Sequence, residues 1–258
     1  MAVGYLAVIL LIVRPALTLS GSQVFFLSIS GCIGFTLGDT FLFQAFRLIG
    51  ARLSMLIMSL APAVAALLGL FLLGEELSAW GVIGMIVTLS GIAMVILGQS
   101  GETTSGGPIH HIARGGILLA VLAAVGQGGG LVFAKMAFRE GSINGFVATL
   151  VRILAALLVL LPASIVSGRY KKPLRVFRAD RTAFLYTVIG SILGPFLGVT
   201  SSLMAIQYTN IGIAATIMAT TPIVMLPIVH YVQKEQLSWR AIVGACIATL
   251  GVAFLFLT

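Results

Sequence analysis

The sequence predicts an all-α polytopic membrane protein with about nine transmembrane helices in two inverted repeats. Its 258 residues are 59% hydrophobic and only 9% charged, whereas a soluble domain carries roughly 25% charged residues. Apolar runs close to the ~20 residues that a helix needs to cross a bilayer recur from end to end. Backbone polar groups in lipid must be satisfied within the segment, which favours helices over open strands. The chain also matches itself at a fixed offset of 160 residues.

The self-match aligns residue types that an apolar composition does not align by chance. Prolines, glutamates and glycines all coincide without a gap: Pro62 with Pro222, Glu75 with Glu235, Gly84 with Gly244 and Gly91 with Gly251. We therefore divide the chain into a first repeat over residues 1–98, a linker over 99–113 and a second repeat over 114–258. The linker region is the longest polar stretch and is rich in Gly, Ser and Thr, as is typical of loops.

Nine apolar segments follow one another along the chain. The predicted spans are 2–19, 24–46, 52–73, 79–98, 114–137, 145–167, 183–206, 211–232 and 239–257. Four precede the linker and five follow it, so we expect the counterpart of span 114–137 to be missing from the first half. The first span is not interpreted as a signal peptide, because no basic region precedes it and Arg14 and Pro15 interrupt it.

The net charge of +8 indicates membrane orientation rather than nucleic-acid binding, because the basic residues lie at the ends of apolar spans. They concentrate in alternate loops, most densely in residues 168–181. The positive-inside rule then places these loops in the cytoplasm and the C-terminus outside. We expect a multi-pass protein of the cell membrane, and of the inner membrane if the source is bacterial.

Small residues and prolines indicate how the helices pack. Small residues recur every fourth position, where helix backbones can approach closely: Ser30, Gly34 and Gly38, their counterparts Gly190, Gly194 and Gly198, and Gly126 with Gly130. Pro62 and Pro222 are predicted to lie mid-helix and to kink their spans, because proline removes a backbone hydrogen bond. Interruptions at matching positions of two halves are typical of a transport site.

At these residues the chain resembles the drug/metabolite transporter superfamily, specifically its EamA-type members. The first half carries the segments AFRLIGARLS, LAPAV and LGEELS, and the second half carries AIQYTNIGIA, TPIV and KEQLS. The resemblance implies ten helices in two inverted five-helix repeats around a central cavity, with the first helix of that plan absent here. It also implies transport of small metabolites, amino acids or drugs, often outward and with proton exchange.

Asp39 is the carboxylate expected inside a span. A charge within the bilayer is costly, so such a residue usually faces the bundle interior or water. In one interpretation Asp39 couples protons or binds a substrate amine. In the other it is a structural acid that bonds neighbouring hydroxyls or caps a helix break after Gly38. Its repeat counterpart is Val199, so the symmetry of the fold does not require an acid there.

Other polar residues in the spans complete the candidate set for substrate or coupling. With Asp39, Pro62 and Pro222, the candidates are Thr40, Gln44, Gln127, Arg152, Thr200 and Ser201. Arg152 resembles an arginine that many family members carry; it either binds an anionic group or a helix C-terminus, or snorkels to the interface. Thr200 and Ser201 either line a cavity or bond their own backbone.

Two further groups are interpreted structurally. Lys135 is interpreted as a snorkelling anchor near a span end. Glu75 and Glu235 belong to a shared turn before Ser78 and Ser238, which are predicted helix N-caps.

We expect a secondary transporter, an exporter of a small organic metabolite such as an amino acid or a drug-like compound. It would work by alternating access, with Asp39 coupling protons if coupling exists. No Walker-type motif occurs in the sequence, and no cofactor or metal is expected. The expected partners are a small-molecule substrate and the lipid bilayer, with a homodimer left open. The alternatives are a non-transporting membrane scaffold and a membrane-embedded lipid-modifying enzyme, although the clustered catalytic groups of an enzyme are not seen.

Overall fold

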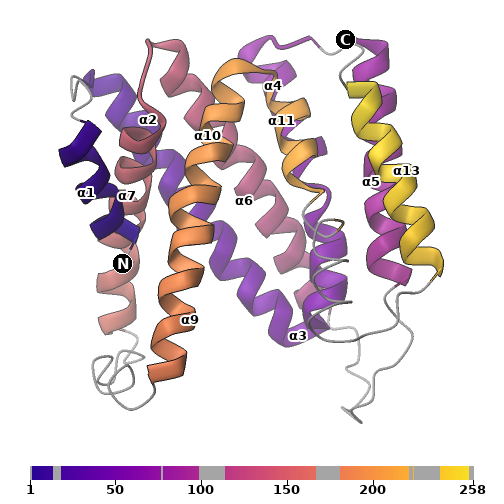
Figure 1. The fold of residues 1–258 in the computed structure, drawn as a ribbon, viewed down its shortest axis with the longest axis horizontal. Coiled ribbons are helices and arrows are strands. Elements are labelled where there is room, and N and C mark those ends of the chain that lie inside the picture. The colour runs from indigo at the N-terminus through magenta and orange to yellow at the C-terminus, as the bar shows by residue number, and fades with distance from the viewer. Residues whose placement is uncertain are drawn as a thin grey trace. The chain divides into compact units, whose positions relative to one another are not determined.

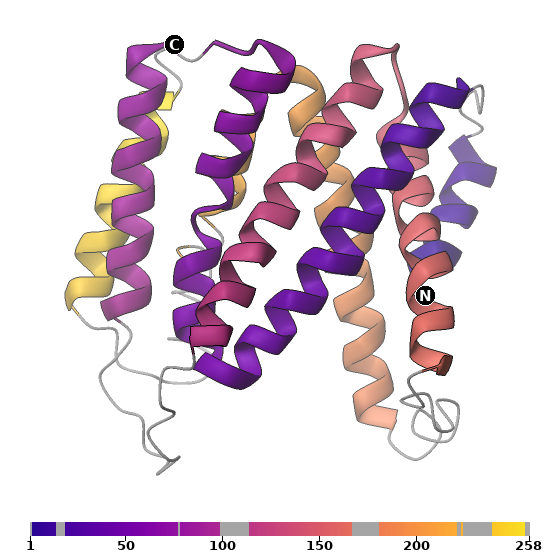
Figure 2. The same ribbon diagram turned by 180° about the vertical axis from the view of Figure 1, so that it is seen from behind.

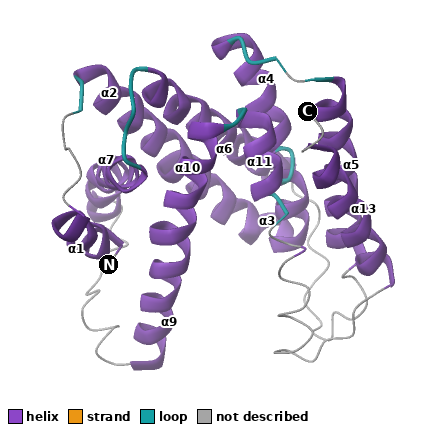
Figure 3. Ribbon diagram, turned by 45° about the horizontal axis from the view of Figure 1, so that its top comes forward, coloured by secondary structure: helices purple, strands orange, loops and turns teal. Residues whose placement is uncertain are grey.

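The structure is a computed structural model, and it describes residues 2–13, 19–76, 78–98, 114–166, 181–220, 223 and 239–255. Its elements are α1 (Ala2–Val13), α2 (Gly21–Gly31), η1 (Cys32–Gly38), α3 (Asp39–Met58), α4 (Ala61–Leu73), α5 (Ala79–Gly98), α6 (Arg114–Arg139), α7 (Gly145–Val166), α9 (Arg181–Ser191), η2 (Ile192–Gly198), α10 (Val199–Tyr208), α11 (Ile211–Met218) and α13 (Trp239–Leu255). Figure 1 shows these helices in chain order, and Figure 3 shows helices joined by loops with no strand in the described part.

The prediction of an all-α polytopic membrane protein is confirmed. Four continuous helices are long and apolar enough to cross a membrane: Gly21–Gly50, Gly115–Arg139, Gly145–Val166 and Phe184–Tyr208. Shorter apolar helices lie within four of the other predicted spans, at Ala2–Ile12, Ala61–Leu73, Ala79–Val95 and Ile242–Phe254. Most of the predicted span 211–232 lies outside the described residues. Helix α5 has the bounds predicted for span 79–98. Gly50 separates the second and third predicted spans, because its positive φ of 78° interrupts the helix there.

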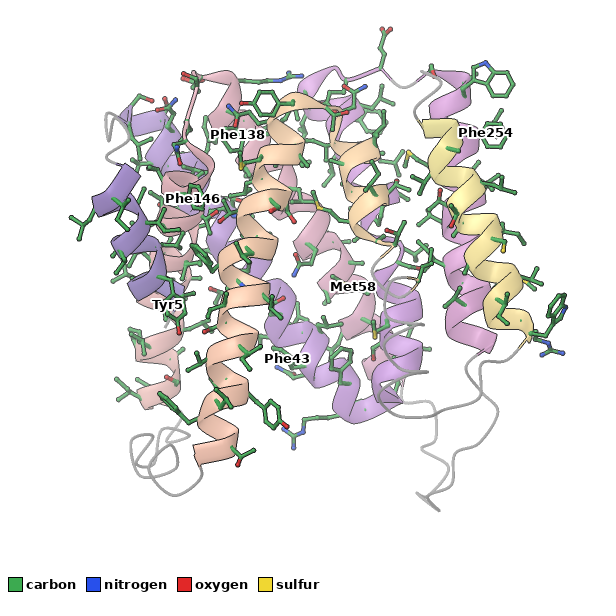
Figure 4. All side chains as sticks on the ribbon, viewed as in Figure 1. Tyr5, Phe43, Met58, Phe138, Phe146 and Phe254 are labelled. Carbon is green, nitrogen blue, oxygen red and sulfur yellow. The ribbon has the colours of Figure 1, made fainter. Side chains whose placement is uncertain are left out.

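The third predicted span is interrupted rather than kinked at its proline. Helix α3 ends at Met58 (labelled in Figure 4), and the Leu60 N–H bonds the Ile57 carbonyl in a tight turn. Helix α4 then begins with Pro62 in its first turn, where the missing N–H has no intrahelical acceptor to lose. The prediction that Pro62 kinks a continuous helix is therefore wrong.

The second repeat contains the same turn, at the equivalent residues. The Thr220 N–H bonds the Ile217 carbonyl at 3.1 Å, as Leu60 bonds Ile57 at 3.0 Å. Pro222 itself lies outside the described residues. The chain is thus discontinuous at matching positions of its two halves.

Two π-helical segments also occupy matching positions. The segments η1 and η2 are each seven residues long, and they begin 160 residues apart, at Cys32 and Ile192. The π-helix is rare and frequently occurs at functional sites, and its i→i+5 bonding displaces the regular helical ladder. Each repeat therefore carries a local change in backbone hydrogen bonding directly before Asp39 or its counterpart Val199.

The chain folds into two compact units that differ from the two sequence repeats. The first unit comprises Met1–Thr36 and Phe133–Tyr208, and the second comprises Leu37–Val132 and Thr209–Thr258. Each unit therefore combines segments from both halves of the sequence.

In the second unit, glycines bring α5 and α13 into backbone contact. A Cβ atom on Gly91 would overlap the backbone of Ala248, and one on Gly251 would overlap Thr88. One on Gly244 would lie 2.7 Å from the Val95 nitrogen. Contacts advance along α5 as they retreat along α13, so the helices are antiparallel, side by side in Figures 1 and 2. Because α13 is the repeat counterpart of α5, the two repeats are inverted.

In the first unit, α7 is the central helix, and α1, α2 and α10 pack against it. Gly31 allows the closest approach, since a Cβ there would overlap the Arg152 carbonyl group. A Cβ on Gly145 would lie 2.6 Å from the Met204 Cγ. The labelled rings of Tyr5 and Phe146 in Figure 4 both contact Phe196 of η2, with centroids 6.2 and 6.1 Å from it.

The two sets of small residues predicted at every fourth position differ in their burial. Ser30, Gly34 and Gly38 are buried, as expected for packed helices. The counterparts Gly190, Gly194 and Gly198 are exposed, and nothing lies within 4 Å of a Cβ built on either of the first two. The prediction of close packing through this second set is wrong. In the first repeat Gly31 makes a close contact with α7, and serine stands at its counterpart, position 191.

Candidate functional site

Two of the predicted site residues meet in the second unit. The Gln127 Nε2 of α6 donates a hydrogen bond of 2.7 Å to the Asp39 Oδ1 of α3. Both side chains are half-buried. Gly38 has helical angles (φ −58°, ψ −53°), so Asp39 does not cap a helix break after it. A neutral amide from another helix thus donates a hydrogen bond to the intramembrane carboxylate.

Glycines on α6 position Gln127. A Cβ on the adjacent Gly128 would lie 3.0 Å from the Ala65 nitrogen and 3.1 Å from the Ala61 carbonyl oxygen, so α6 lies directly on α4. One on Gly116 would overlap the side chain of Ile49, which places α6 against α3 as well. The glycine cluster around Gln127 thus serves close helix packing, and that packing determines which side chains α6 presents to α3 and α4.

Other candidates of the second unit lie close to this pair. Thr40 follows Asp39 and is half-buried, whereas Gln44 is exposed one turn further along α3. Pro62 is buried in the first turn of α4, next to Ala61, whose carbonyl faces Gly128. The structure therefore places Gln127 on a helix, α6, that packs against both the helix of Asp39 and the helix of Pro62, whereas Gln44 is exposed.

In the first unit Arg152 is buried, with 3% of its surface exposed. Its guanidinium carbon lies 4.8 Å from the centroid of the Phe35 ring, a cation–π arrangement. Snorkelling to an interface is therefore excluded as the interpretation of Arg152. Lys135 of α6 is also buried, at 9% exposure, so its interpretation as a snorkelling anchor is wrong. Packing around a charge cannot be deduced from its distance to a span end.

The repeats, the broken helices and the inverted packing agree with a match to known proteins. The model of the EamA-like transporter family matches residues 1–97 and 114–257. The chain belongs to the EamA-like transporter family. A crystal structure described only as that of a protein is similar to this EamA-like protein with a TM-score of 0.72 and 19% identity, covering 99% of this chain and 82% of the other. At that identity the likeness shows the fold alone. No curated protein matches the chain.

The family consists of membrane transporters rather than enzymes. The candidate residues of the EamA-like protein are therefore considered as residues of a transporter. In the part of the chain that the structure describes, no group of three or more His, Cys, Asp or Glu side chains is placed to hold a metal ion.

The hydroxyl candidates of the second repeat differ in their surroundings. Thr200 is buried, and its Oγ1 donates to the Phe196 carbonyl of η2 at 2.6 Å. This is the bond to its own backbone that was one of the two interpretations from sequence. Ser201 is exposed on α10. The hydroxyl of Thr200 thus satisfies a carbonyl of the π-helical segment.

Glu75 of the EamA-like protein has a role that the sequence only partly indicated. Its Oε2 accepts a hydrogen bond of 2.8 Å from the backbone N–H of Ile211, the first residue of α11. Asn210, at the N-cap, makes no side-chain cap. A carboxylate from the first repeat therefore supplies the cap of a helix in the second, and the helix dipole favours its charge there. The predicted N-cap Ser78 accepts from the Gly81 N–H at 3.1 Å; Glu235 and Ser238 lie outside the described residues.

Proposed function

We propose that this EamA-like protein is a secondary carrier that exports a small organic metabolite, such as an amino acid or a drug-like compound, by alternating access. In this proposal it works in the cell membrane, the inner membrane of a bacterium, and couples export to proton entry through Asp39. The observation that carries the proposal is the 2.7 Å hydrogen bond from Gln127 to Asp39.

A glutamine amide suits a partner that changes its protonation state. Its NH₂ group donates to a carboxylate, and its carbonyl oxygen accepts from a protonated carboxylic acid. Gln127 is therefore able to satisfy Asp39 in either state without importing a second charge into the membrane. An arginine or lysine partner would stabilise only the ionised acid. A neutral, two-way partner supports proton exchange at Asp39.

The backbone supplies points at which the helices can bend. The segment η1 ends at Gly38, directly before Asp39, and the chain breaks again at Ser59 and Leu60. Sharp changes of helix direction occur where the regular hydrogen-bond ladder is interrupted. Equivalent interruptions in the second repeat support a cycle in which the inverted halves exchange roles.

The test uses purified protein in liposomes that enclose a pH-sensitive dye, and the amount of each compound that crosses the membrane is measured in parallel. A gradient of pooled amino acids and small metabolites is imposed on wild type, Asp39→Asn and Glu76→Gln. Glu76 is an exposed loop residue, so its variant is the matched control for loss of one carboxylate. We expect metabolite-dependent proton movement in wild type and in Glu76→Gln, and its loss in Asp39→Asn.

Each outcome decides one part of the proposal. Proton movement that persists at the wild-type rate in Asp39→Asn contradicts coupling through this residue. Metabolite movement without protons in wild type contradicts coupling and leaves the carrier intact. No movement of any pooled compound by the wild-type protein contradicts the carrier itself.

A further inference from the structure

The interior of the first unit holds a guanidinium whose position is determined by packing. Arg152 approaches η1 because its own backbone lies against Gly31. One turn further along α7, the Ala155 carbonyl accepts a weak hydrogen bond from the Cys32 Sγ at 3.8 Å. Phe35 of the same π-helical segment places its ring under the guanidinium, 4.8 Å from the Cζ atom. Stacking on a ring face leaves the in-plane N–H groups of an arginine directed sideways.

Thr36 follows Phe35 and presents a buried hydroxyl with an unused hydrogen-bonding capacity. The residue is 8% exposed, and its buried Oγ1 has no hydrogen-bond partner among the described residues. The other buried threonines in the described chain all donate to the carbonyl four residues earlier: Thr88 to Gly84, Thr149 to Gly145, Thr200 to Phe196 and Thr216 to Gly212. Thr36 is the exception, and it lies within the π-helical segment, where the regular ladder is displaced.

The buried charges of this unit have one sign. Arg152 and Lys135 are the charged side chains buried among its described residues, and both are cationic. Glu140, its described carboxylate, is exposed and accepts a hydrogen bond from the Ser22 hydroxyl at 2.9 Å. The described polar and aromatic groups around Arg152 are therefore a second cation in the same unit, the ring of Phe35 and the hydroxyl of Thr36.

We propose that Arg152 and Thr36 form a binding subsite for the carboxylate of an organic anion. A guanidinium binds a carboxylate through two parallel N–H···O bonds, and the threonine hydroxyl supplies a third donor. Phe35 holds the plane of the guanidinium and offers an apolar surface to the rest of the ligand. This inference rests on the proposed carrier function and narrows its substrates to carboxylates.

The subsite is tested by ligand-dependent thermal stability of the purified full chain in neutral detergent. The probes are acetate, benzoate and glutamate, each compared with the corresponding amide, together with inorganic phosphate. The variants are Arg152→Lys, which keeps the charge but loses the paired donors, and Thr36→Val, which keeps the shape but loses the hydroxyl. Thr249→Val is the matched control, because Thr249 is exposed on α13 and bonds its own backbone at 2.8 Å.

We expect at least one carboxylate to stabilise wild type at concentrations where its amide does not. Either subsite variant should lower the affinity for that carboxylate by roughly 10-fold to 100-fold, as expected for a lost hydrogen bond to a charged group. The Thr249→Val variant should bind it as wild type does. Thr36→Val should also be at least as stable as wild type without ligand, because it removes a buried hydroxyl that has no partner. A merely structural threonine would lower stability instead.

Three results overturn the subsite: no carboxylate-specific stabilisation across the panel, equal affinities in both variants and wild type, or stabilisation by phosphate alone. The last would assign the positive interior to a phosphate group, from lipid or from solution. These results are distinguishable from failure of the carrier. A protein that moves no metabolite in liposomes but binds carboxylates through Arg152 contradicts the carrier only. One that moves amides and carboxylates alike, unaffected by Arg152→Lys, contradicts the subsite only.

Discussion

Gln127 of α6 and Asp39 of α3 are joined by a 2.7 Å hydrogen bond across 88 residues of sequence. The bond has no symmetric copy, because valine stands at position 199, the repeat counterpart of Asp39. The first repeat thus carries an intramembrane acid that the second repeat lacks at the equivalent position. Because the pair has no equivalent in the second repeat, substituting either residue tests this one hydrogen bond.

Replacing Gln127 by leucine should destabilise the protein and slow proton movement. Without the amide, Asp39 keeps its place in the interior but loses the hydrogen bond from Gln127, and such a loss costs about 1–3 kcal/mol of unfolding free energy for a buried group and less for a half-buried one. Thermal unfolding in detergent and the liposome assay measure the two effects. Gln44→Leu, at an exposed position one turn away on α3, should change either quantity little. Equal effects at the two positions would show that the pair is incidental.

Replacing Glu75 by alanine should destabilise the N-terminus of α11. The lost carboxylate leaves the Ile211 N–H without its acceptor, and loss of a helix cap costs about 0.5–2 kcal/mol. Glu75→Gln retains an acceptor oxygen and should recover part of that loss. Hydrogen exchange of the first turn of α11 measures the effect locally, and Glu76→Ala, at the exposed neighbouring position, serves as the control. Undiminished protection in Glu75→Ala would contradict the cap.

Adding a methyl group at the α5–α13 contact should lower the stability of the protein, although alanine has a better helix propensity than glycine. Gly91→Ala and Gly251→Ala each place a Cβ against the facing backbone, and overpacking of this kind costs about 1–3 kcal/mol. Gly115→Ala, with nothing within 4 Å of the added atom, should be neutral or slightly stabilising. Thermal unfolding of the three variants decides the point. A loss of stability at Gly115 equal to that at Gly91 would mean that the alanines act through something other than this contact.

The membrane orientation predicted from the basic loops can be tested with fused reporter proteins. We expect an enzyme that is active only outside the cytoplasm to be active when fused after Thr258. A fluorescent protein that folds only in the cytoplasm should be dark there and bright when inserted within residues 168–181. The reverse pattern of signals would invert the assignment. Neutralising the lysines and arginines of that loop should then reduce the preference for one orientation.

The helices and the inverted repeat could be predicted because both leave patterns that are recognisable in the sequence alone. Apolar length marks the spans, and the offset of 160 residues aligns Pro62 with Pro222 and Gly91 with Gly251. The π-helical segments and the turn at Leu60 could not be predicted, since a shifted backbone hydrogen bond leaves no mark in hydrophobic periodicity. The proline indicated approximately where the helix is interrupted. Its position in the first turn of α4 could not be predicted, because that position depends on where the preceding helix ends.

The site residues could be named singly but not as partners. Asp39 and Gln127 stand out as polar groups in apolar spans, yet their meeting depends on which face α6 presents, and Gly128 decides that through its contact with α4. Arg152 is a similar case. Its distance from a span end permits snorkelling, and only the ring of Phe35 and the close approach of Gly31 show that it is enclosed.

The glycine contact between α5 and α13 bears on the ancestry of the chain. Gly91 meets Ala248, and Gly251 meets Thr88, so each helix offers the other the same surface at the same register. Such an isologous contact is what a single surface forms with a second copy of itself. One half of this protein, inserted twice in opposite directions, would present that surface to its twin before any fusion joined them.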